Sequence, residues 1–202
     1  MPRTKQYEPD RIAGIAMNVF WTQGYGATSI EDLAEATGLS RSSLYSEYGS
    51  KRELFSTALN HYLEYFGTRL APLSEGGLDA LEAFFQQVSA DQPDKPAGCL
   101  MVNTMTELVP PDPSFADDAD LYRIMIKDAF SDALATAETR GEIDSGSPGR
   151  RADFLTTQLF GLFVELRAQT SRTDIERSVE GIIAEVRSWK RLSLKRRLGD
   201  PT

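Results

Sequence analysis

Apolar residues recur with the 3.6-residue period of an α-helix along nearly all of this chain, and no segment alternates as a β-strand does. Near the N-terminus this pattern forms one apolar stripe, made of Ile12, Ile15, Ala16, Val19 and Phe20. Pro9 suits the first turn of that helix, and Gly24 follows its last turn, where glycine is favoured. The pattern therefore predicts an all-α fold.

Capping residues and chain breakers mark the ends of the expected helices. Thr28, Ser29 and Ser50 each precede an acidic residue by three positions, which is the spacing of a capping box. The second helix is short and ends near Gly38, and the fourth covers about residues 51–66. Clusters of glycine and proline separate five further helices, expected over residues 77–90, 98–109, 114–140, 149–171 and 173–191.

The composition excludes several classes of protein. No run approaches the roughly 18 apolar residues of a membrane-spanning helix, and the N-terminus lacks the apolar segment of a secretory signal. We therefore expect a cytoplasmic protein without a membrane partner. The single cysteine, Cys99, cannot form an internal disulfide, and the single histidine, His61, leaves too few ligands for a Cys/His zinc site. We predict no metal, no cofactor and no catalytic residues.

The net charge of −8 comes mostly from the middle of the chain, and it disfavours binding to polyanions in general. One local face can still bind DNA, and residues 28–48 have the pattern of a helix-turn-helix. Leu33 and Leu44 can pack across the turn, where Gly38 can adopt the positive φ of a sharp bend. The second of the two helices, capped by Ser40, exposes Arg41, Ser42, Ser43 and Ser46. A short polar face of this kind suits a major groove about 12 Å wide.

Neighbouring residues can hold the DNA backbone. Lys51 adds a positive charge to the amides and dipole at the start of the fourth helix. The hydroxyls of Tyr45 and Thr28 can donate to phosphate oxygens. Glu31 and Glu47 lie near the same face and would repel phosphates.

A dense series of motifs runs between Arg11 and Leu63: Gly24-Tyr25, Ala27-Thr28-Ser29-Ile30, Asp32-Leu33-Ala34, Gly38-Leu39-Ser40, Leu44-Tyr45, Tyr48-Gly49-Ser50-Lys51 and Glu53-Leu54. This series resembles the DNA-binding domain of TetR-family transcriptional regulators. Glu31 stands where a basic or polar residue is frequent in the family. Ser46-Glu47 replaces the aromatic residue and histidine often found after the tyrosine.

The resemblance implies a dimeric, ligand-responsive repressor that binds double-stranded operator DNA. A helix-turn-helix domain over residues 1–50 would join a larger helical domain for effector binding and dimerisation over residues 51–202, with the helix over 51–66 connecting them. It also implies operator contacts at the matching positions, which are Thr28, Arg41, Ser42, Ser43, Tyr45 and Lys51. The exposed helix adds Ser40 and Ser46 to this set.

The last two helices, expected over residues 149–171 and 173–191, carry more apolar side chains than would be buried if each packed one face against the core. Docked on a second copy, they would form a four-helix bundle around a two-fold axis. The candidate dimer residues are Leu155, Leu159, Leu162, Leu166, Val179, Ile182, Ile183 and Val186. Packing within the chain is the alternative for part of this set.

A ligand site in the larger domain would use aromatic and soft apolar side chains. The candidates are Phe84, Phe85, Met101, Met105, Tyr122, Met125, Phe160 and Phe163. Asn103 and Glu107 are candidate polar anchors for a small, largely apolar effector. For each of these residues taken singly, core packing is the simpler explanation.

Cys99 opens a helix, where the helix dipole can lower a thiol pKa. It is therefore a candidate redox or electrophile sensor, although a buried structural cysteine is the preferred interpretation.

Two other functions compete with that of a ligand-responsive regulator. One is a small helical enzyme, and the other is a DNA-binding protein whose body binds only another protein. The sequence offers no nucleophile, base or glycine-rich phosphate loop for an enzyme.

Overall fold

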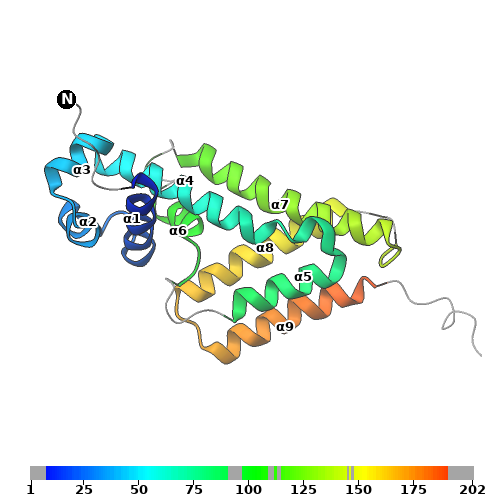
Figure 1. The fold of residues 1–202 in the computed structure, drawn as a ribbon. Coiled ribbons are helices and arrows are strands. Elements are labelled where there is room, and N and C mark those ends of the chain that lie inside the picture. Colours follow the sequence, from blue (N-terminus) through cyan, green and yellow to red (C-terminus); the bar gives the residue numbers. More distant parts are fainter. Residues whose placement is uncertain are drawn as a thin grey trace, which may run out of the picture. The chain divides into compact units, whose positions relative to one another are not determined.

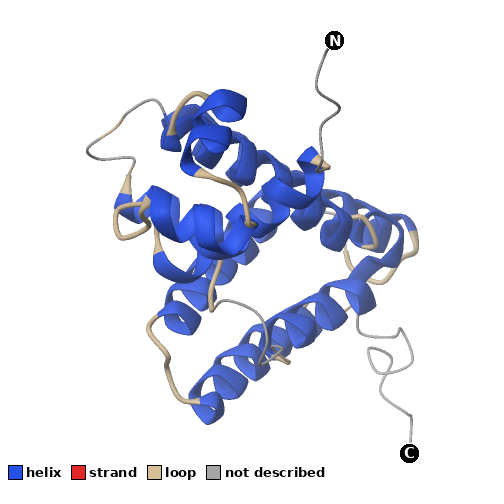
Figure 2. Cartoon of the chain, turned by 60° about the vertical axis from the view of Figure 1, so that its left-hand side comes forward, coloured by secondary structure: helices blue, strands red, loops and turns tan. Residues whose placement is uncertain are grey.

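The computed structural model describes residues 8–90, 97–108, 112, 115–144, 146 and 148–190. Within these ranges every regular element is an α-helix (Figure 2). The sole β-type contact among the described residues is an isolated bridge between Ile143 and Lys190. The prediction of an all-α fold is confirmed.

The first four helices follow the predicted punctuation. They are α1 (Pro9–Gln23), α2 (Ile30–Thr37), α3 (Arg41–Tyr48) and α4 (Lys51–Leu70). Pro9 occupies the first helical position of α1, and Ser29 and Ser40 cap α2 and α3 with their side chains. Helix α4 continues four residues beyond the predicted end at residue 66, because Gly67 lies within it without breaking it.

Five further helices complete the described part of the chain. They are α5 (Leu73–Ser89), α6 (Leu100–Glu107), α7 (Ala116–Thr139), α8 (Pro148–Arg167) and α9 (Arg172–Ser188). Their bounds agree with the prediction to within four residues. The largest differences, of four residues each, are at the start of α5 and at the end of α8. Helix α5 begins before a backbone break at Gly77, where φ is +60°.

The chain divides into two compact units. The first comprises Met1–Arg69, Asp94–Tyr122 and Phe163–Gln169, and the second comprises Leu70–Pro93, Arg123–Leu162 and Thr170–Thr202. This division does not follow the predicted boundary after residue 50. Helix α6 and parts of α4, α7 and α8 group with the first three helices.

Aromatic side chains fill the first unit. Helix α4 places Phe55, Tyr62 and Phe66 on one face. Phe20 of α1 packs edge-on against Phe55, and Trp21 packs edge-on against Tyr62, at centroid distances of 4.9 and 5.0 Å.

The apolar stripe of α1 lies slightly rotated from its predicted position. Trp21 and Met17 are buried, whereas Ile15 and Val19 of the predicted stripe are only half-buried. Helix α1 contacts both α2 and α6, so its buried face is wider than one stripe.

The second unit is built around the pairing of α5 with α9, which lie side by side (Figure 1). The rings of Phe84 and Phe85 meet Phe130 of α7 at 5.7 and 5.8 Å. Glu82 of α5 binds Arg187 of α9 at 2.7 Å, and the hydrogen bond from this guanidinium holds the pKa of Glu82 below its usual value.

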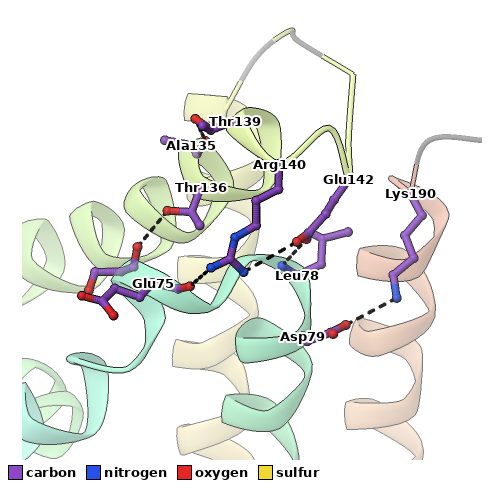
Figure 3. Close-up of polar contacts among 10 residues, drawn as sticks. Glu75, Leu78, Asp79, Ala135, Thr136, Thr139, Arg140, Glu142 and Lys190 are labelled. Carbon is purple, nitrogen blue, oxygen red and sulfur yellow. Dashed lines mark hydrogen bonds and ion pairs between the residues drawn. The ribbon is translucent and has the colours of Figure 1, made fainter.

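The break in α5 is held by the C-terminal end of α7 (Figure 3). Arg140 donates to the carbonyl oxygen of Glu75, and the Thr136 hydroxyl donates to that of Ser74 at 2.8 Å. Glu142 accepts from the backbone N–H of Leu78 at 3.0 Å, on the other side of the break. Backbone groups freed by the irregular turn are thus paired by side chains.

Candidate DNA-binding surface

Helices α2 and α3 form a compact helix-turn-helix beside α1 (Figure 1). Gly38 ends α2 in the left-handed conformation, with φ 72° and ψ 11°, and its N–H donates to the carbonyl oxygen of Ala34. No atom lies within 4 Å of where its side chain would be, so backbone conformation alone calls for glycine here. Leu33 and Leu44 are both fully buried, as the predicted packing across the turn requires.

Side-chain caps fix where both helices begin. Ser29 and Asp32 form a capping box, in which each side chain accepts from the other's backbone N–H. The hydrogen bond from the Ser29 hydroxyl lowers the pKa of Asp32, with smaller contributions from the Ser29 backbone and the charge of Lys51. In α3, Ser40 accepts from the N–H of Ser43 at 3.1 Å. The entry of each helix is therefore defined by local hydrogen bonds.

The outer face of α3 is polar and open. Arg41, Ser42, Tyr45 and Ser46 are all exposed, and their i, i+1, i+4, i+5 spacing places them on one side of the helix. Ser40 is also exposed at the start of this face. Ser43 is half-buried, and its hydroxyl lies 2.8 Å from that of Ser40. The structure thus brings the predicted base-reading residues together on one surface.

Arg41 has an acidic neighbour across the turn. Its Nη1 lies 2.5 Å from the Glu31 Oε1 of α2, and both side chains remain more than half exposed. The carboxylate predicted to repel phosphates is therefore paired with the residue predicted to read bases.

Lys51 lies at the start of α4, as predicted, with its Nζ 4.3 Å from the centre of the Tyr25 ring. The amide of Glu53 is already used, because it donates to the Ser50 hydroxyl at 3.2 Å, and that hydroxyl donates to the Glu53 carboxylate. A phosphate at this helix start would rely on the lysine charge and the remaining amides.

Thr28 is not available as a phosphate donor. Only 1% of its surface is exposed, and its hydroxyl donates to the carbonyl oxygen of Gly24 at 2.6 Å. The predicted contact by this hydroxyl is wrong, because the hydroxyl stabilises the turn between α1 and α2.

Cys99 is fully buried at the start of α6. The Tyr62 hydroxyl donates to its Sγ at 3.0 Å, and the Tyr122 hydroxyl lies at the same distance. The Sγ also accepts from the N–H of Val102 at 3.4 Å, so the cysteine caps the helix. Burial raises the pKa of the thiol, which outweighs the lowering by these hydrogen bonds. The backbone amides at the start of α6 also lower the pKa of the thiol, but by less than burial raises it, so the net shift is upward.

The candidate ligand residues divide equally between the two units. Met101, Met105, Tyr122 and Phe163 belong to the first, and Phe84, Phe85, Met125 and Phe160 belong to the second. Five of them are buried in the core, while three keep partial exposure: Met105, Met125 and Phe160. The proposed anchor Glu107 binds the backbone of the α1–α2 link instead.

A family model described as bacterial regulatory proteins, tetR family, matches residues 14–58. Similarity to two curated proteins extends further. The HTH-type transcriptional repressor ComR of Escherichia coli K12 is 29% identical over 197 residues, which cover 94% of this chain and 92% of ComR. The uncharacterized HTH-type transcriptional regulator YezE of Bacillus subtilis 168 is 33% identical over 149 residues, which cover 71% of this chain and 77% of YezE. The chain belongs to the TetR family.

Solved structures of TetR-family proteins agree with this assignment. A cysteine mutant of the TetR-family regulator CifR, complexed with 26-bp double-strand operator DNA, has a TM-score of 0.80 and 26% identity, covering 90% of this chain and 98% of that one. A TetR regulator from Chloroflexus aurantiacus J-10-FL shares the fold, with a TM-score of 0.79, 23% identity and coverage of 91% and 96%. The chain is therefore a DNA-binding transcriptional regulator and not an enzyme.

The dimer residues predicted for a TetR-family protein need correction. Seven of the eight are buried within the single chain: Leu155, Leu159, Leu162, Val179, Ile182, Ile183 and Val186. Only Leu166 is half-buried. A side chain already enclosed by its own chain cannot pack on a second copy, so these residues form core.

Two contacts that hold the α1–α2 link were not predicted from the sequence, although Glu107 was named there as a candidate ligand anchor. Glu107 of α6 binds backbone N–H groups of the α1–α2 link, and Arg167 of α8 binds carbonyl groups at the end of α1. The glycines on either side of Tyr25 were the available signal, because they allow a close approach by another group.

In the described residues, no helix is both long and apolar enough to cross a membrane.

Proposed function

We propose that this TetR-family protein is a homodimeric repressor that binds a palindromic operator and releases it when a small, largely apolar effector binds. The observation that carries the DNA-binding part is the exposed polar face of α3, with Arg41 and Tyr45 at its centre. Caps at both short helices and the buried Leu33 and Leu44 hold this face rigidly. ComR, which is similar along nearly its full length, is named a repressor.

The exposed faces of α8 and α9 support the dimer. On α8, Phe154 and Gly161 are exposed, and on α9, Gly181 and Ala184 are exposed. A side chain at either glycine would meet no atom within 4 Å. Glycine inside a helix costs about 0.5–1 kcal/mol relative to alanine. A second copy approaching closely would give these glycines a role that their own chain does not.

A two-fold dimer determines the form of the operator. Its two α3 helices would enter successive major grooves about 34–36 Å apart, or a multiple of that distance. The two half-sites would then be inverted repeats of each other. Arg41 would read a base edge, and Lys51 would hold a phosphate without reading sequence.

Release by an effector rests on a difference in affinity between two conformations. The partly exposed Met125 and Phe160, which both belong to the second unit, offer adaptable apolar surface to such a ligand. Helix α4 begins beside α3 with Lys51 and carries Phe55, Tyr62 and Phe66 into the first unit. We assign it the transmission of the ligand signal.

Fluorescence anisotropy with labelled DNA from the region upstream of the protein's own gene tests this function. Tight binding to one inverted repeat is expected, and about five extra base pairs between the half-sites should abolish it, because they turn one half-site to the opposite side of the duplex. A panel of small apolar compounds, first screened by thermal shift, should contain ligands that release the DNA. Binding to all DNA alike would contradict the proposal, and specific binding that no ligand reverses would leave a regulator controlled by another protein.

A further inference from the structure

The link between α1 and α2 is held by one carboxylate from α6. Glu107 Oε1 accepts from the N–H of Gly26 at 2.5 Å, and Oε2 accepts from the N–H of Tyr25 at 3.2 Å. Hydrogen bonds to an ionised acceptor are roughly twice as strong as those between neutral groups. The contact joins residues 81 positions apart, so it belongs to the tertiary fold.

The link is shaped to admit this carboxylate. A Cβ atom at Gly26 would lie 2.9 Å from Glu107 Oε1, and one at Gly24 would lie 3.0 Å from Oε2. Gly24 also has a φ of +89°, which other residues rarely adopt. Any larger residue at either position would push the carboxylate away from the two amides.

A second side chain holds the same link from its other end. Arg167 Nη1, at the end of α8, lies 3.2 Å from the carbonyl oxygens of both Trp21 and Thr22 and donates to them. These carbonyls lie in the last turn of α1, where helix carbonyls lack intrahelical partners and a positive charge is favourable. An anion on the amides and a cation on the carbonyls thus fix the exit of α1.

Helix α6 connects this contact to a buried polar cluster. At its N-terminal end the Cys99 thiol accepts from Tyr62 of α4 and lies beside the Tyr122 hydroxyl. At its C-terminal end is Glu107. A helix of this length spans about 12 Å and is stiff on that scale. All these residues belong to the first compact unit.

We infer that Glu107 is a positioning residue for operator binding, which sets the direction of α2 and α3 through the α1–α2 link. A shift of α6 would then change the pose of the recognition helix α3 directly, by a route that does not pass through α4. The inference rests on the proposed operator binding.

Two substitutions at position 107 test it. Glu107→Gln keeps the length of the side chain but replaces one acceptor with a donor, and Glu107→Ala removes both acceptors. Glu64→Gln is the matched control, because Glu64 is exposed on α4 in the same unit and makes no polar contact with the described residues. Circular dichroism confirms that each variant is folded.

Amide hydrogen exchange at Tyr25 and Gly26 measures the contact without DNA. We expect exchange about tenfold faster or more in both Glu107 variants, and no change in Glu64→Gln. Operator affinity, measured by anisotropy, should fall by about tenfold in Glu107→Ala. Removing the negative charge of Glu107 would by itself strengthen binding to DNA. A weaker operator affinity in Glu107→Ala therefore shows that Glu107 acts by positioning the helices and not by its charge.

Gly26→Ala provides an independent variant that keeps the charge. The added methyl group displaces the carboxylate, so Gly26→Ala should lower operator affinity as Glu107→Ala does. A double variant that carries both substitutions should lose no more operator affinity than either single variant, because both remove the same contact. Three results would each overturn the role of Glu107. They are unchanged amide exchange at Tyr25 and Gly26, unchanged operator affinity in the variants, and a loss of affinity in the double variant that equals the sum of the two single losses. Failure of the wild-type protein to bind its operator would instead overturn the proposed function, which keeps the two results distinct.

Discussion

Arg41, at the first position of the recognition helix α3, is paired with Glu31 of α2 at 2.5 Å. The two residues stand on opposite sides of the turn at Gly38. An exposed pair of this kind contributes only about 0–1 kcal/mol to stability. Its effect on DNA recognition is larger than its effect on folding, because it restrains the guanidinium predicted to read a base and places a negative charge near the phosphates.

Replacing Glu31 with Gln should therefore strengthen binding to all DNA and weaken discrimination between bases. The gain arises from the lost repulsion, and the loss of discrimination arises because the Arg41 guanidinium is no longer held in place. Affinities for the operator and for a set of single-base-pair variants, compared at fixed salt, measure both effects.

Glu35 offers the control for this substitution. It is exposed one turn further along α2 and makes no polar contact with the residues that the structure describes. Glu35→Gln removes the same charge but leaves the Arg41 pair intact, so it should change affinity without changing discrimination. Identical responses of the two variants would show that Glu31 acts by charge alone.

Arg41 and Lys51 should respond differently to substitution. Arg41→Ala should cost about 1–3 kcal/mol at one operator base pair and relax the preference there. Lys51→Ala should weaken binding to every sequence and reduce the salt slope by about one. Affinities for operator variants over a range of salt concentrations separate the two roles. Equal effects of both substitutions on all operator variants would refute the division between reading and anchoring.

The helix-turn-helix could be predicted from the sequence because its determinants are local. Gly38 sets the turn, Ser29 and Ser40 cap the helices within three residues, and Leu33 and Leu44 are eleven positions apart. Such signals act over a few residues and are visible as spacing.

Contacts between distant residues leave no comparable signal. Arg167 meets Trp21 across 146 positions, and nothing in the local pattern of α8 indicates it. Periodicity likewise placed Val179 and Ile183 on one apolar helix face. It cannot show whether residues of the same chain or of a second copy cover that face. The orientation of the Thr28 hydroxyl depends on the irregular α1–α2 link in the same way.

The surfaces that remain exposed on α8 and α9 lead to a test of the dimer. Gly161→Leu adds a large side chain to an open position, so the monomer should tolerate it while a closely packed dimer should not. Analytical ultracentrifugation should show a shift toward monomer, and operator affinity should fall because the two half-sites are no longer bound together. Ala135→Leu on the exposed face of α7 is the control. Dissociation by Ala135→Leu but not by Gly161→Leu would place the dimer interface elsewhere.

The buried cluster of Cys99, Tyr62 and Tyr122 predicts that the protein loses stability in alkaline solution. Burial raises the pKa of the thiol and of both phenols, so the folded protein keeps protons that the unfolded chain releases. The stabilising effect is complete below the unfolded-state pKa values, about 8.5 for cysteine and 10 for tyrosine, and is lost as the pH rises above them. Each group fully ionised only in the unfolded chain lowers the free energy of unfolding by about 1.4 kcal/mol per pH unit.

Urea denaturation between about pH 8 and pH 10 measures this loss, and Cys99→Ser should remove the part that begins near pH 8.5.

The variant Cys99→Ser also tests the hypothesis that Cys99 is a redox or electrophile sensor. A buried thiol with a raised pKa carries little thiolate near neutral pH, so alkylation of the folded protein should be slow. Operator binding should then respond to hydrogen peroxide no more in the wild type than in Cys99→Ser. Rapid oxidation that releases DNA only when Cys99 is present would show that the burial of this thiol opens in solution and that the cysteine is a sensor.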